Sequence, residues 1–228
     1  MKVAVIGKGK TGQAVIDLLK REEIHQVFDS QNPPTCEKLK GADVAVVFVN
    51  AAVFEHIYPV LLEVQIPVVS GVTGFRYDQK LIQSVTEAGK PWVVAHNFSL
   101  SMVLIKEALS SLGKLGSLSK ETAYSLSETH HTQKLDAPSG TALSWQSWLN
   151  VDDCPIESIR KDDVKGIHAL HIDNSNEHIE LLHTAHSRTL FAEGALWSAR
   201  YLNLHKELTG FYQFDEIVKK GVTINELE

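Results

Sequence analysis

Short apolar runs alternate with longer amphipathic segments through the first hundred residues of this 228-residue chain. The apolar runs are rich in valine and almost uninterrupted, as is typical of strands buried on both faces. We expect strands at residues 3–6, 26–29, 44–49, 67–70 and 92–95. We expect helices at residues 11–22, 53–64 and 78–88, and no complete helix in the link 30–41. Strands that alternate with helices in this way predict a parallel sheet with crossover helices.

The pattern changes after residue 97. Helical periodicity covers residues 99–112, strict alternation predicts a half-buried strand at 122–128, and a helix is expected at 138–149. Two further strands are expected at 167–172 and 179–184, and two helices at 192–205 and 214–219. The predicted fold class is α/β, with an α+β domain on a mixed sheet inserted into a Rossmann-like domain. The Rossmann-like domain would comprise residues 1–97 and 189–228, and the inserted domain residues 98–188.

A glycine-rich turn, Gly-Lys-Gly-Lys-Thr-Gly, joins the first expected strand to the first expected helix. A lone Gly-x-Gly-x-x-Gly is weak, but strand–turn–helix is the context that dinucleotide binding requires. The first glycine allows the tight turn, the second lets the backbone approach a pyrophosphate, and the third lets the helix pack closely. The alternative is an ordinary glycine-rich connection. The candidate cofactor residues of this turn are Gly7, Gly9, Lys10, Thr11 and Gly12.

Asp29 ends the second expected strand, where an acid can accept hydrogen bonds from an adenosine ribose. Ser30 follows and no arginine lies nearby to pair with a 2′-phosphate, so NADH is expected in preference to NADPH. Two alternatives stay open: Asp29 caps only the strand end, or Lys10 meets a phosphate.

Composition limits the partners of the chain. A formal charge of −6 argues against nucleic acid and anionic membranes, because both select a basic face. No apolar run is long enough to span a membrane, and the N-terminus does not resemble a signal peptide. The two cysteines, Cys36 and Cys154, form no Cys-x-x-Cys pair, so a disulfide framework and a zinc site are not implied. The expectation is a soluble, cytoplasmic protein.

Residues 128–142 read Glu-Thr-His-His-Thr-Gln-Lys-Leu-Asp-Ala-Pro-Ser-Gly-Thr-Ala and concentrate groups that bind anions and move protons. A helix that starts near Pro138 would offer main-chain N–H groups and two hydroxyls at its positive end. A helix dipole contributes only ~0.3–1 kcal/mol to an anion, whereas a charge-assisted hydrogen bond adds ~1.5–3 kcal/mol. Lys134 and a histidine would therefore be needed for a dianion, with Arg188 as a further candidate. The alternative is a surface turn followed by a well-capped helix.

Four motifs in this chain resemble those of the dihydrodipicolinate reductase family. The segment 128–142 matches that family's signature, and Gly71-Val72-Thr73-Gly74-Phe75 resembles its Gly-Thr-Thr-Gly-Phe. Ala95-His96-Asn97-Phe98-Ser99 resembles the hinge between the family's domains, and residues 187–195 resemble the return hinge. The resemblance spans nearly the whole chain.

The resemblance implies reduction of 4-hydroxy-tetrahydrodipicolinate, or dihydrodipicolinate, to tetrahydrodipicolinate in lysine (diaminopimelate) biosynthesis. NAD(P)H would deliver hydride to C4 of the ring, and a protein acid would protonate C3. His130 and Lys134 are carried over as the catalytic candidates, and which of them donates the proton stays open. The implied carboxylate-binding residues are His131, Lys134, Ser139, Gly140 and Thr141. The implied additional cofactor residues are Gly71, Thr73, His96, Asn97 and Phe98.

The resemblance also implies a homo-oligomer, a tetramer in the family, with a dimer as the alternative because the region near 173–177 is short. No metal is expected: in His168-x-x-His171 and His183-x-x-His186 the histidines would point to opposite faces of a strand. Two other functions remain alternatives, an NAD(P)-dependent oxidoreductase acting on another imino or keto dicarboxylate and a catalytically silent nucleotide-binding regulator. A silent relative would be expected to lose His130, Lys134 or the Ser-Gly-Thr turn, and all three are present.

Overall fold

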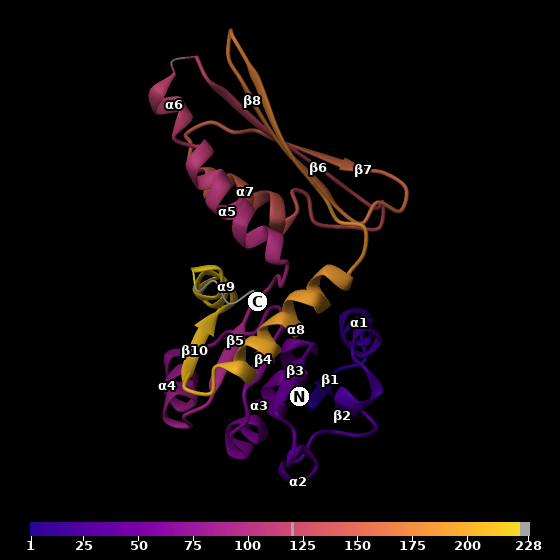
Figure 1. Cartoon of the computed structure of the whole chain (residues 1–228). Helices are drawn as coiled ribbons and strands as arrows, with labels where there is room; N and C mark the ends of the chain where they lie inside the picture. The colour runs from indigo at the N-terminus through magenta and orange to yellow at the C-terminus, as the bar shows by residue number, and fades with distance from the viewer. Residues whose placement is uncertain (120, 224–228) are drawn as a thin grey trace. The chain divides into compact units, whose positions relative to one another are not determined.

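The computed structural model describes residues 1–119 and 121–223, and the chain divides into two compact units (Figure 1). The first unit contains residues 1–100 together with the chain from Arg188 onward. The second unit is Ser101–Ser187. The second unit is thus an insertion between two parts of the first.

A six-stranded parallel sheet forms the centre of the first unit, in the order β10-β5-β4-β3-β1-β2. Its strands are β1 (Val3–Ile6), β2 (Ile24–Phe28), β3 (Val44–Val47), β4 (Val68–Ser70), β5 (Pro91–Val94) and β10 (Gly210–Gln213). The residues of β1, β3, β4 and β5 are all buried, which explains their unbroken apolar sequence. The predicted Rossmann-like parallel sheet is confirmed.

Helices connect these strands and pack on the sheet. They are α1 (Lys10–Leu18), η1 (Arg21–Glu23), α2 (Cys36–Leu39), α3 (Ala51–Val64), α4 (Gln79–Glu87), α8 (Thr189–Leu204) and α9 (Phe214–Thr223). A cluster of aromatic side chains packs in the core, where Phe54 contacts the rings of Phe75, Tyr77 and Trp92. Burial among these rings raises the pKa of Tyr77 to about 12, so this hydroxyl stays protonated at neutral pH.

A four-stranded mixed sheet forms the second unit, in the order β7-β6-β8-β9. Strands β6 (Ala123–His130) and β7 (Ile156–Arg160) run parallel to each other. Strand β8 (Ile167–Asp173) pairs antiparallel with β6, and β9 (His178–Thr184) pairs antiparallel with β8. One face of this sheet is covered by α5 (Leu100–Leu112) and α7 (Gly140–Leu149). Met102, Trp145 and Leu170 lie in the core that the helices and the sheet form together. The short helix α6 (Leu115–Leu118) follows α5. The predicted mixed sheet is confirmed (Figure 1).

Several expected boundaries are wrong. The helix expected at 11–22 ends at Leu18, because Leu19 turns to extended backbone and buries its side chain. A one-turn helix, α2, lies in the link where no complete helix was expected; the Thr35 hydroxyl accepts the N–H of Lys38 and caps it. The helix expected at 192–205 begins at Thr189, and that expected at 214–219 continues to Thr223. Strands β7 and β10 were not predicted, since neither sequence alternates strongly enough.

Two corrections concern the histidine segment. The expected strand at 122–128 extends to His130, because β8 pairs as far as Thr129 and Arg160 of β7 pairs with His130. His130 is therefore a strand residue rather than a loop residue. The following helix begins at Gly140 rather than Pro138, with Ser139 as its N-cap.

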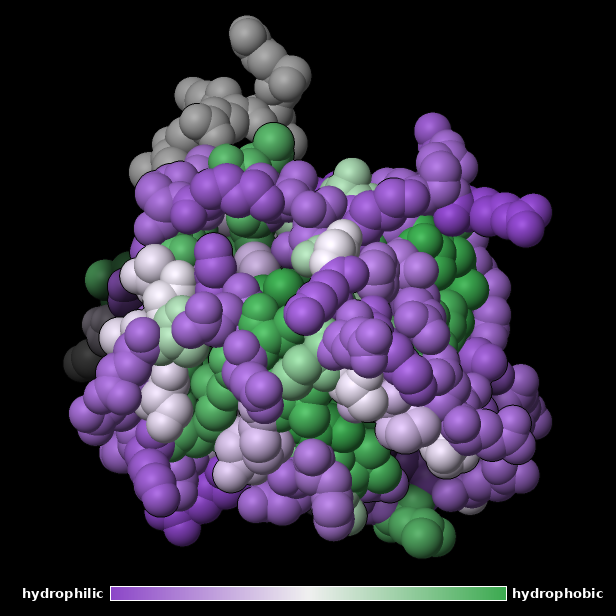
Figure 2. All heavy atoms as spheres, turned by 90° about the horizontal axis from the view of Figure 1, so that it is seen from below, coloured by the Kyte–Doolittle hydropathy of each residue, from purple (hydrophilic) through white to green (hydrophobic). Residues whose placement is uncertain are grey.

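Hydrophilic residues cover most of the face seen in Figure 2, and hydrophobic residues are exposed between them near its middle. Among residues 1–119 and 121–223, no helix is both long and apolar enough to cross a membrane.

Candidate functional site

The glycine turn of the first unit is shaped by two close backbone approaches. Gly7 has a φ of +104°, and a Cβ on it would lie 2.2 Å from the carbonyl oxygen of Phe48. A Cβ on Gly12 would lie 1.9 Å from the carbonyl oxygen of Gly7, so α1 packs directly on the turn. A Cβ on Gly9 would meet nothing within 4 Å. Gly9 is also the N-cap of α1, so open space lies at the helix start where a phosphate could bind.

The carboxylate of Asp29 lies immediately after β2 and is held in a fixed orientation. It accepts the N–H groups of Gln31 and Asn32 at 3.0 Å each, and Lys8 Nζ lies 3.0 Å away. The ion pair with Lys8 and the two amide bonds hold the pKa of Asp29 below its usual value. Lys8 was not predicted to contact Asp29, although it lies inside the glycine turn between Gly7 and Gly9.

The other candidate cofactor residues follow β4 and β5. The carboxyl ends of parallel strands meet at one sheet edge, so Gly71, Thr73, His96 and Asn97 lie at the same edge as the glycine turn. Gly71 is required by packing, because a Cβ there would lie 2.1 Å from the Phe48 ring. Asn97 accepts the N–H of Ser99 at 2.8 Å, whereas Thr73 and His96 are exposed.

Phe98 differs from the other cofactor candidates because its side chain is buried. It packs against the rings of Phe48 and Phe214 with centroids 6.0 and 4.8 Å away. Phe98 therefore contributes to the core of the first unit next to the carboxyl edge of the sheet. Lys10 and Thr11, the first residues of α1, lie beside the open space at Gly9, with Lys10 exposed and Thr11 partly buried.

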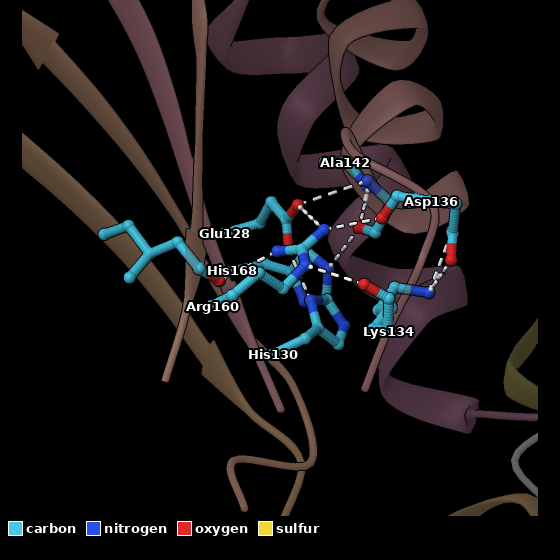
Figure 3. A network of polar contacts seen from close by, with 9 residues as sticks. Glu128, His130, Lys134, Asp136, Ala142, Arg160 and His168 are labelled. Carbon is cyan, nitrogen blue, oxygen red and sulfur yellow. Dashed lines mark hydrogen bonds and ion pairs between the residues drawn. The ribbon is translucent and has the colours of Figure 1, made fainter. Parts of the chain in front are cut away.

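Strand register brings a second set of polar side chains together in the second unit. Alternation places Glu128 and His130 on the same face of β6 as the core residues Tyr124 and Leu126. Arg160 of β7 pairs with His130, and His168 of β8 pairs with Glu128. Four polar side chains from three strands thus lie at the end of the core where α7 begins, as Figure 3 shows.

The buried carboxylate of Glu128 links these groups. Its Oε2 is bound to His130 Nδ1, and its Oε1 accepts Arg160 Nη2 at 2.9 Å and the N–H of Ser139 at 3.3 Å. Burial alone would raise the pKa of Glu128, but the hydrogen bonds from Arg160 and His130 hold this pKa below its usual value. The residue is therefore an ionised carboxylate inside the unit.

The pKa of His130 is lowered, mainly because the ring is buried. The bond to Glu128 acts in the opposite direction, and the charges of Lys134 and Arg160 add to the lowering. A proton taken up by His130 is thus held weakly enough to be released. A Cβ on Gly166 would lie 3.1 Å from His130 Nε2, so the glycine at that position keeps this nitrogen uncrowded.

The loop after β6 carries Lys134, whose ammonium group binds both oxygens of Asp136 at 2.8 Å. Arg160 fixes this loop by donating to the main-chain carbonyls of Asp136 at 2.6 Å and Lys134 at 3.3 Å. Asp136 is largely exposed, so a substrate carboxylate could replace it as the partner of Lys134. His131 precedes the turn, and its carbonyl accepts the N–H of Lys134.

The start of α7 provides the predicted anion-binding groups unequally. Ser139 is buried: its hydroxyl accepts the N–H of Ala142 at 3.2 Å and lies 3.1 Å from His168 Nε2. Its N–H is already bound to Glu128. Gly140 is exposed and Thr141 partly buried, and their N–H groups belong to the first turn of the helix. These two amides are the more accessible donors, while Ser139 caps the helix.

One predicted substrate-binding residue is not part of the second unit. Arg188 belongs to the first unit, where it is the N-cap residue of α8. Among the described residues, no group of three or more His, Cys, Asp or Glu side chains is arranged to hold a metal ion. Sequence reasoning missed Arg160, which lies on an unpredicted strand, and His168, which it weighed only as a metal ligand. Glu128 and Asp136 were part of the quoted motif but received no role.

Known proteins are similar to this chain over most of its length. A family model described as dihydrodipicolinate reductase, N-terminus, matches residues 1–98, and one described as dihydrodipicolinate reductase, C-terminus, matches residues 99–218. A 4-hydroxy-tetrahydrodipicolinate reductase of Christiangramia forsetii is 31% identical over 96% of this chain and 98% of its own. One from Bdellovibrio bacteriovorus is 30% identical over 96% of each chain.

A solved structure has a similar fold. Dihydrodipicolinate reductase from Paenisporosarcina sp. TG-14, bound to dipicolinate, superposes with a TM-score of 0.74 at 23% identity. The match covers 95% of this chain and 99% of the other.

Proposed function

The chain belongs to the dihydrodipicolinate reductase family, and we propose that it reduces 4-hydroxy-tetrahydrodipicolinate to tetrahydrodipicolinate with a hydride from NAD(P)H. It is accordingly an oxidoreductase of lysine (diaminopimelate) biosynthesis. The observation that carries this assignment is the match of both family models, which together extend over residues 1–218.

The NAD(P)H cofactor supplies the hydride, and the residues at the carboxyl edge of the first sheet fit such a group. Gly9 leaves open space at the start of α1, where N–H groups and the helix dipole favour a pyrophosphate. We place the adenosine ribose beside Asp29, whose carboxylate is oriented by two amides. The nicotinamide side is assigned to Gly71, Thr73, His96 and Asn97.

The substrate is a small dicarboxylate, and the second unit offers separate groups for its two carboxylates and its proton. Lys134, His131 and the amides of Gly140 and Thr141 would bind carboxylate, with Ser139 shaping the helix start. His130 and Lys134 are the two candidate proton donors. Arg188 stays a predicted further cation. Its contribution to substrate binding would appear as a raised KM in Arg188→Ala.

NADH is the proposed preferred cofactor. The carboxylate of Asp29 would accept from the ribose hydroxyls of NADH and repel the 2′-phosphate of NADPH. Lys8 acts against this preference, because its ammonium group lies 3.0 Å from Asp29 and could turn to a phosphate. The proposal fails if the specificity constant for NADPH equals or exceeds that for NADH.

A homo-oligomer built on the second unit's sheet is also proposed. On the face of that sheet opposite its core, Ile159 and Leu182 are 38% and 57% exposed. Their register places them in the outward-facing rows of β7 and β9. A tetramer is the expected state, with a dimer as the alternative. Leu182→Lys should reduce the mass measured by light scattering if this face is the interface.

The cytoplasm is the proposed location of the enzyme. Cys36 and Cys154 are both free thiols in the structure, as expected for a chain kept in a reducing compartment.

The decisive experiment measures NADH or NADPH oxidation at 340 nm while the substrate is formed enzymatically from pyruvate and aspartate semialdehyde. We expect oxidation that requires both precursors and the purified protein, and no oxidation when the substrate-forming enzyme is omitted. Absence of turnover with either cofactor would contradict the assignment to lysine biosynthesis.

A further inference from the structure

The carboxylate of Glu128 occupies an unusual position for an acidic residue. The residue is 1% exposed, and its carboxylate binds His130, Arg160 and the N–H of Ser139, three groups of the candidate substrate site (Figure 3). Burying a charge costs free energy even when it is paired, so stability alone gives little reason to keep it. This burial suggests that the charge serves the chemistry of its neighbours.

The contact with His130 determines which ring nitrogen is available to a ligand. Glu128 Oε2 is bound to Nδ1, so this nitrogen carries the proton of the hydrogen bond. The opposite nitrogen, Nε2, lies beside Gly166, where the missing side chain leaves it uncrowded. A histidine held in this way can gain and release a proton at Nε2 without turning its ring.

Arg160 holds Glu128 and the neighbouring loop in one arrangement. Its Nη2 donates both to Glu128 at 2.9 Å and to the carbonyl of Asp136 at 2.6 Å. Its Nε donates to the carbonyl of Lys134 at 3.3 Å. The guanidinium thereby connects the carboxylate under His130 to the loop that carries Lys134.

We propose that Glu128 is a positioning residue for His130, fixing the imidazole through Nδ1 so that Nε2 delivers the proton to the substrate, and that Arg160 keeps Glu128 in place. This inference rests on the proposed reductase function. In the step, the Nε2–H bond breaks and the electron pair at ring carbon C3 forms the new C–H bond. The imidazolium becomes neutral imidazole, and its Nδ1 proton remains in the bond to Glu128.

The charged groups that face His130 determine in which direction its pKa should move when one of them is removed. They are Glu128 on its own strand, Arg160 on β7, Lys134 in the loop and His168 on β8. Glu128 raises the pKa of His130, whereas Arg160 and Lys134 lower it. Removing the charge of Glu128 should therefore lower the pKa of the proton donor, and removing the charge of Arg160 should raise it.

The test compares pH profiles of kcat/KM for wild type, Glu128→Gln and Arg160→Gln. The falling limb reports the pKa of the essential acid in the free enzyme. We expect Glu128→Gln to move this limb down by about one pH unit or more and to lower kcat at pH 7 at least about tenfold. Arg160→Gln should move the limb upward. Glu157→Gln, an exposed site on β7, is the matched control and should leave the profile unchanged.

Shifts in opposite directions support positioning, because simple loss of structure would not produce them. A Glu128→Gln variant that keeps the wild-type limb overturns the proposal, whether its activity is retained or lost. So does a limb that moves the same way in both variants.

A second measurement does not depend on turnover and separates this proposal from the proposed function. Nitrogen-15 NMR of histidine-labelled protein reports which ring nitrogen is protonated, with His130→Gln used to assign the signal. Above its pKa, His130 should be protonated at Nδ1 in wild type and should become a mixture of both forms in Glu128→Gln. An unchanged spectrum overturns the positioning role even if the enzyme is active. The expected spectral change with no reductase activity would contradict only the proposed function.

Discussion

The glycine turn of the first unit and the histidine loop of the second unit each place the start of a helix where an anion can bind. In the turn, space is made by missing side chains: Gly7 and Gly12 allow close backbone contact, and Gly9 leaves the start of α1 open. In the loop, the helix start is held by side chains, with Ser139 as cap and the buried Glu128 beneath it. The first site is built from main chain and the second from a polar network.

This difference explains why the two sites respond differently to changes. A main-chain site requires particular backbone conformations, so substitutions should act through folding or through space for the ligand. A buried polar network depends on charge and protonation, so substitutions there should act through pH and catalysis.

Gly12→Ala should have the largest effect. The added Cβ would lie 1.9 Å from the carbonyl oxygen of Gly7, and backbone atoms cannot move aside easily. We expect a loss of stability of about 3 kcal/mol or more, at the upper end of single substitutions, seen as little folded protein or a strongly lowered Tm. Thermal unfolding followed by circular dichroism measures it.

Gly9→Ala is the matched control for that variant, because a Cβ on Gly9 meets nothing within 4 Å. Its Tm should stay close to wild type while its affinity for NADH falls, since the new methyl group would occupy the space assigned to the pyrophosphate. A Gly9→Ala protein that binds NADH normally would remove the turn from the cofactor site.

Lys134→Ala should have the next largest effect, and it should change turnover of the substrate without changing the affinity for NADH. Loss of this ammonium group would remove both a proposed partner of a substrate carboxylate and a candidate proton donor, so kcat/KM should fall about 10²–10³-fold. The dissociation constant for NADH, measured by fluorescence titration, should change less than about twofold. Lys165→Ala, an exposed lysine of the same unit, serves as control. A large loss of NADH affinity in Lys134→Ala would mean that this residue lies in the cofactor pocket.

The sequence predicted the structure of the local glycine turn better than that of the polar network, which is distributed over three strands. The turn lies within six consecutive positions, so spacing was sufficient to find Gly7, Gly9 and Gly12. The polar network joins residues up to 40 positions apart, from Glu128 to His168, and depends on the register of three strands. Since β7 was not predicted, nothing in the sequence could place Arg160 beside Glu128.

The same contrast applies to the fold. The parallel sheet was predictable because its strands are apolar throughout and separated by clear helices. Strands β7 and β10 are partly exposed, so their sequences resemble loops. Their placement depends on pairing with β6 and β5, which are distant in the sequence.

His168 gives a prediction about acid stability in the second unit. Burial, together with the charges of His130 and His183, lowers its pKa from 6.5 to about 4. Because the folded form takes up this proton less readily than the unfolded chain, stability should fall as the pH drops below 6.5 and continue to fall until about pH 4. The expected loss between pH 7 and pH 5 is about 2 kcal/mol from this residue.

Urea unfolding of wild type and His168→Gln at pH 7 and pH 5 measures that loss. The variant should lose about 2 kcal/mol less than wild type over this interval. Glu128 does not interfere: its lowered pKa adds stability that is complete above its unfolded value of 4.5 and is lost only at lower pH. His186→Gln, at an exposed histidine, is the control. Equal pH dependence in wild type and His168→Gln would show that burial of His168 does not contribute to acid sensitivity.

The smallest expected effect concerns an ion pair beside the glycine turn, that of Lys8 and Asp29. Asp29→Ser removes the carboxylate that accepts hydrogen bonds from two main-chain N–H groups, and it leaves Lys8 without its ion-pair partner. Both changes favour a 2′-phosphate, so the ratio of kcat/KM for NADPH to that for NADH should rise about tenfold, as is typical when one hydrogen bond at a partly exposed site is exchanged. Adding Lys8→Ala to Asp29→Ser should cancel much of this rise, because the freed ammonium group is then absent. If Asp29→Ser leaves the ratio unchanged, cofactor choice is made by the backbone of the turn alone, and the contrast between a main-chain site and a side-chain site becomes complete.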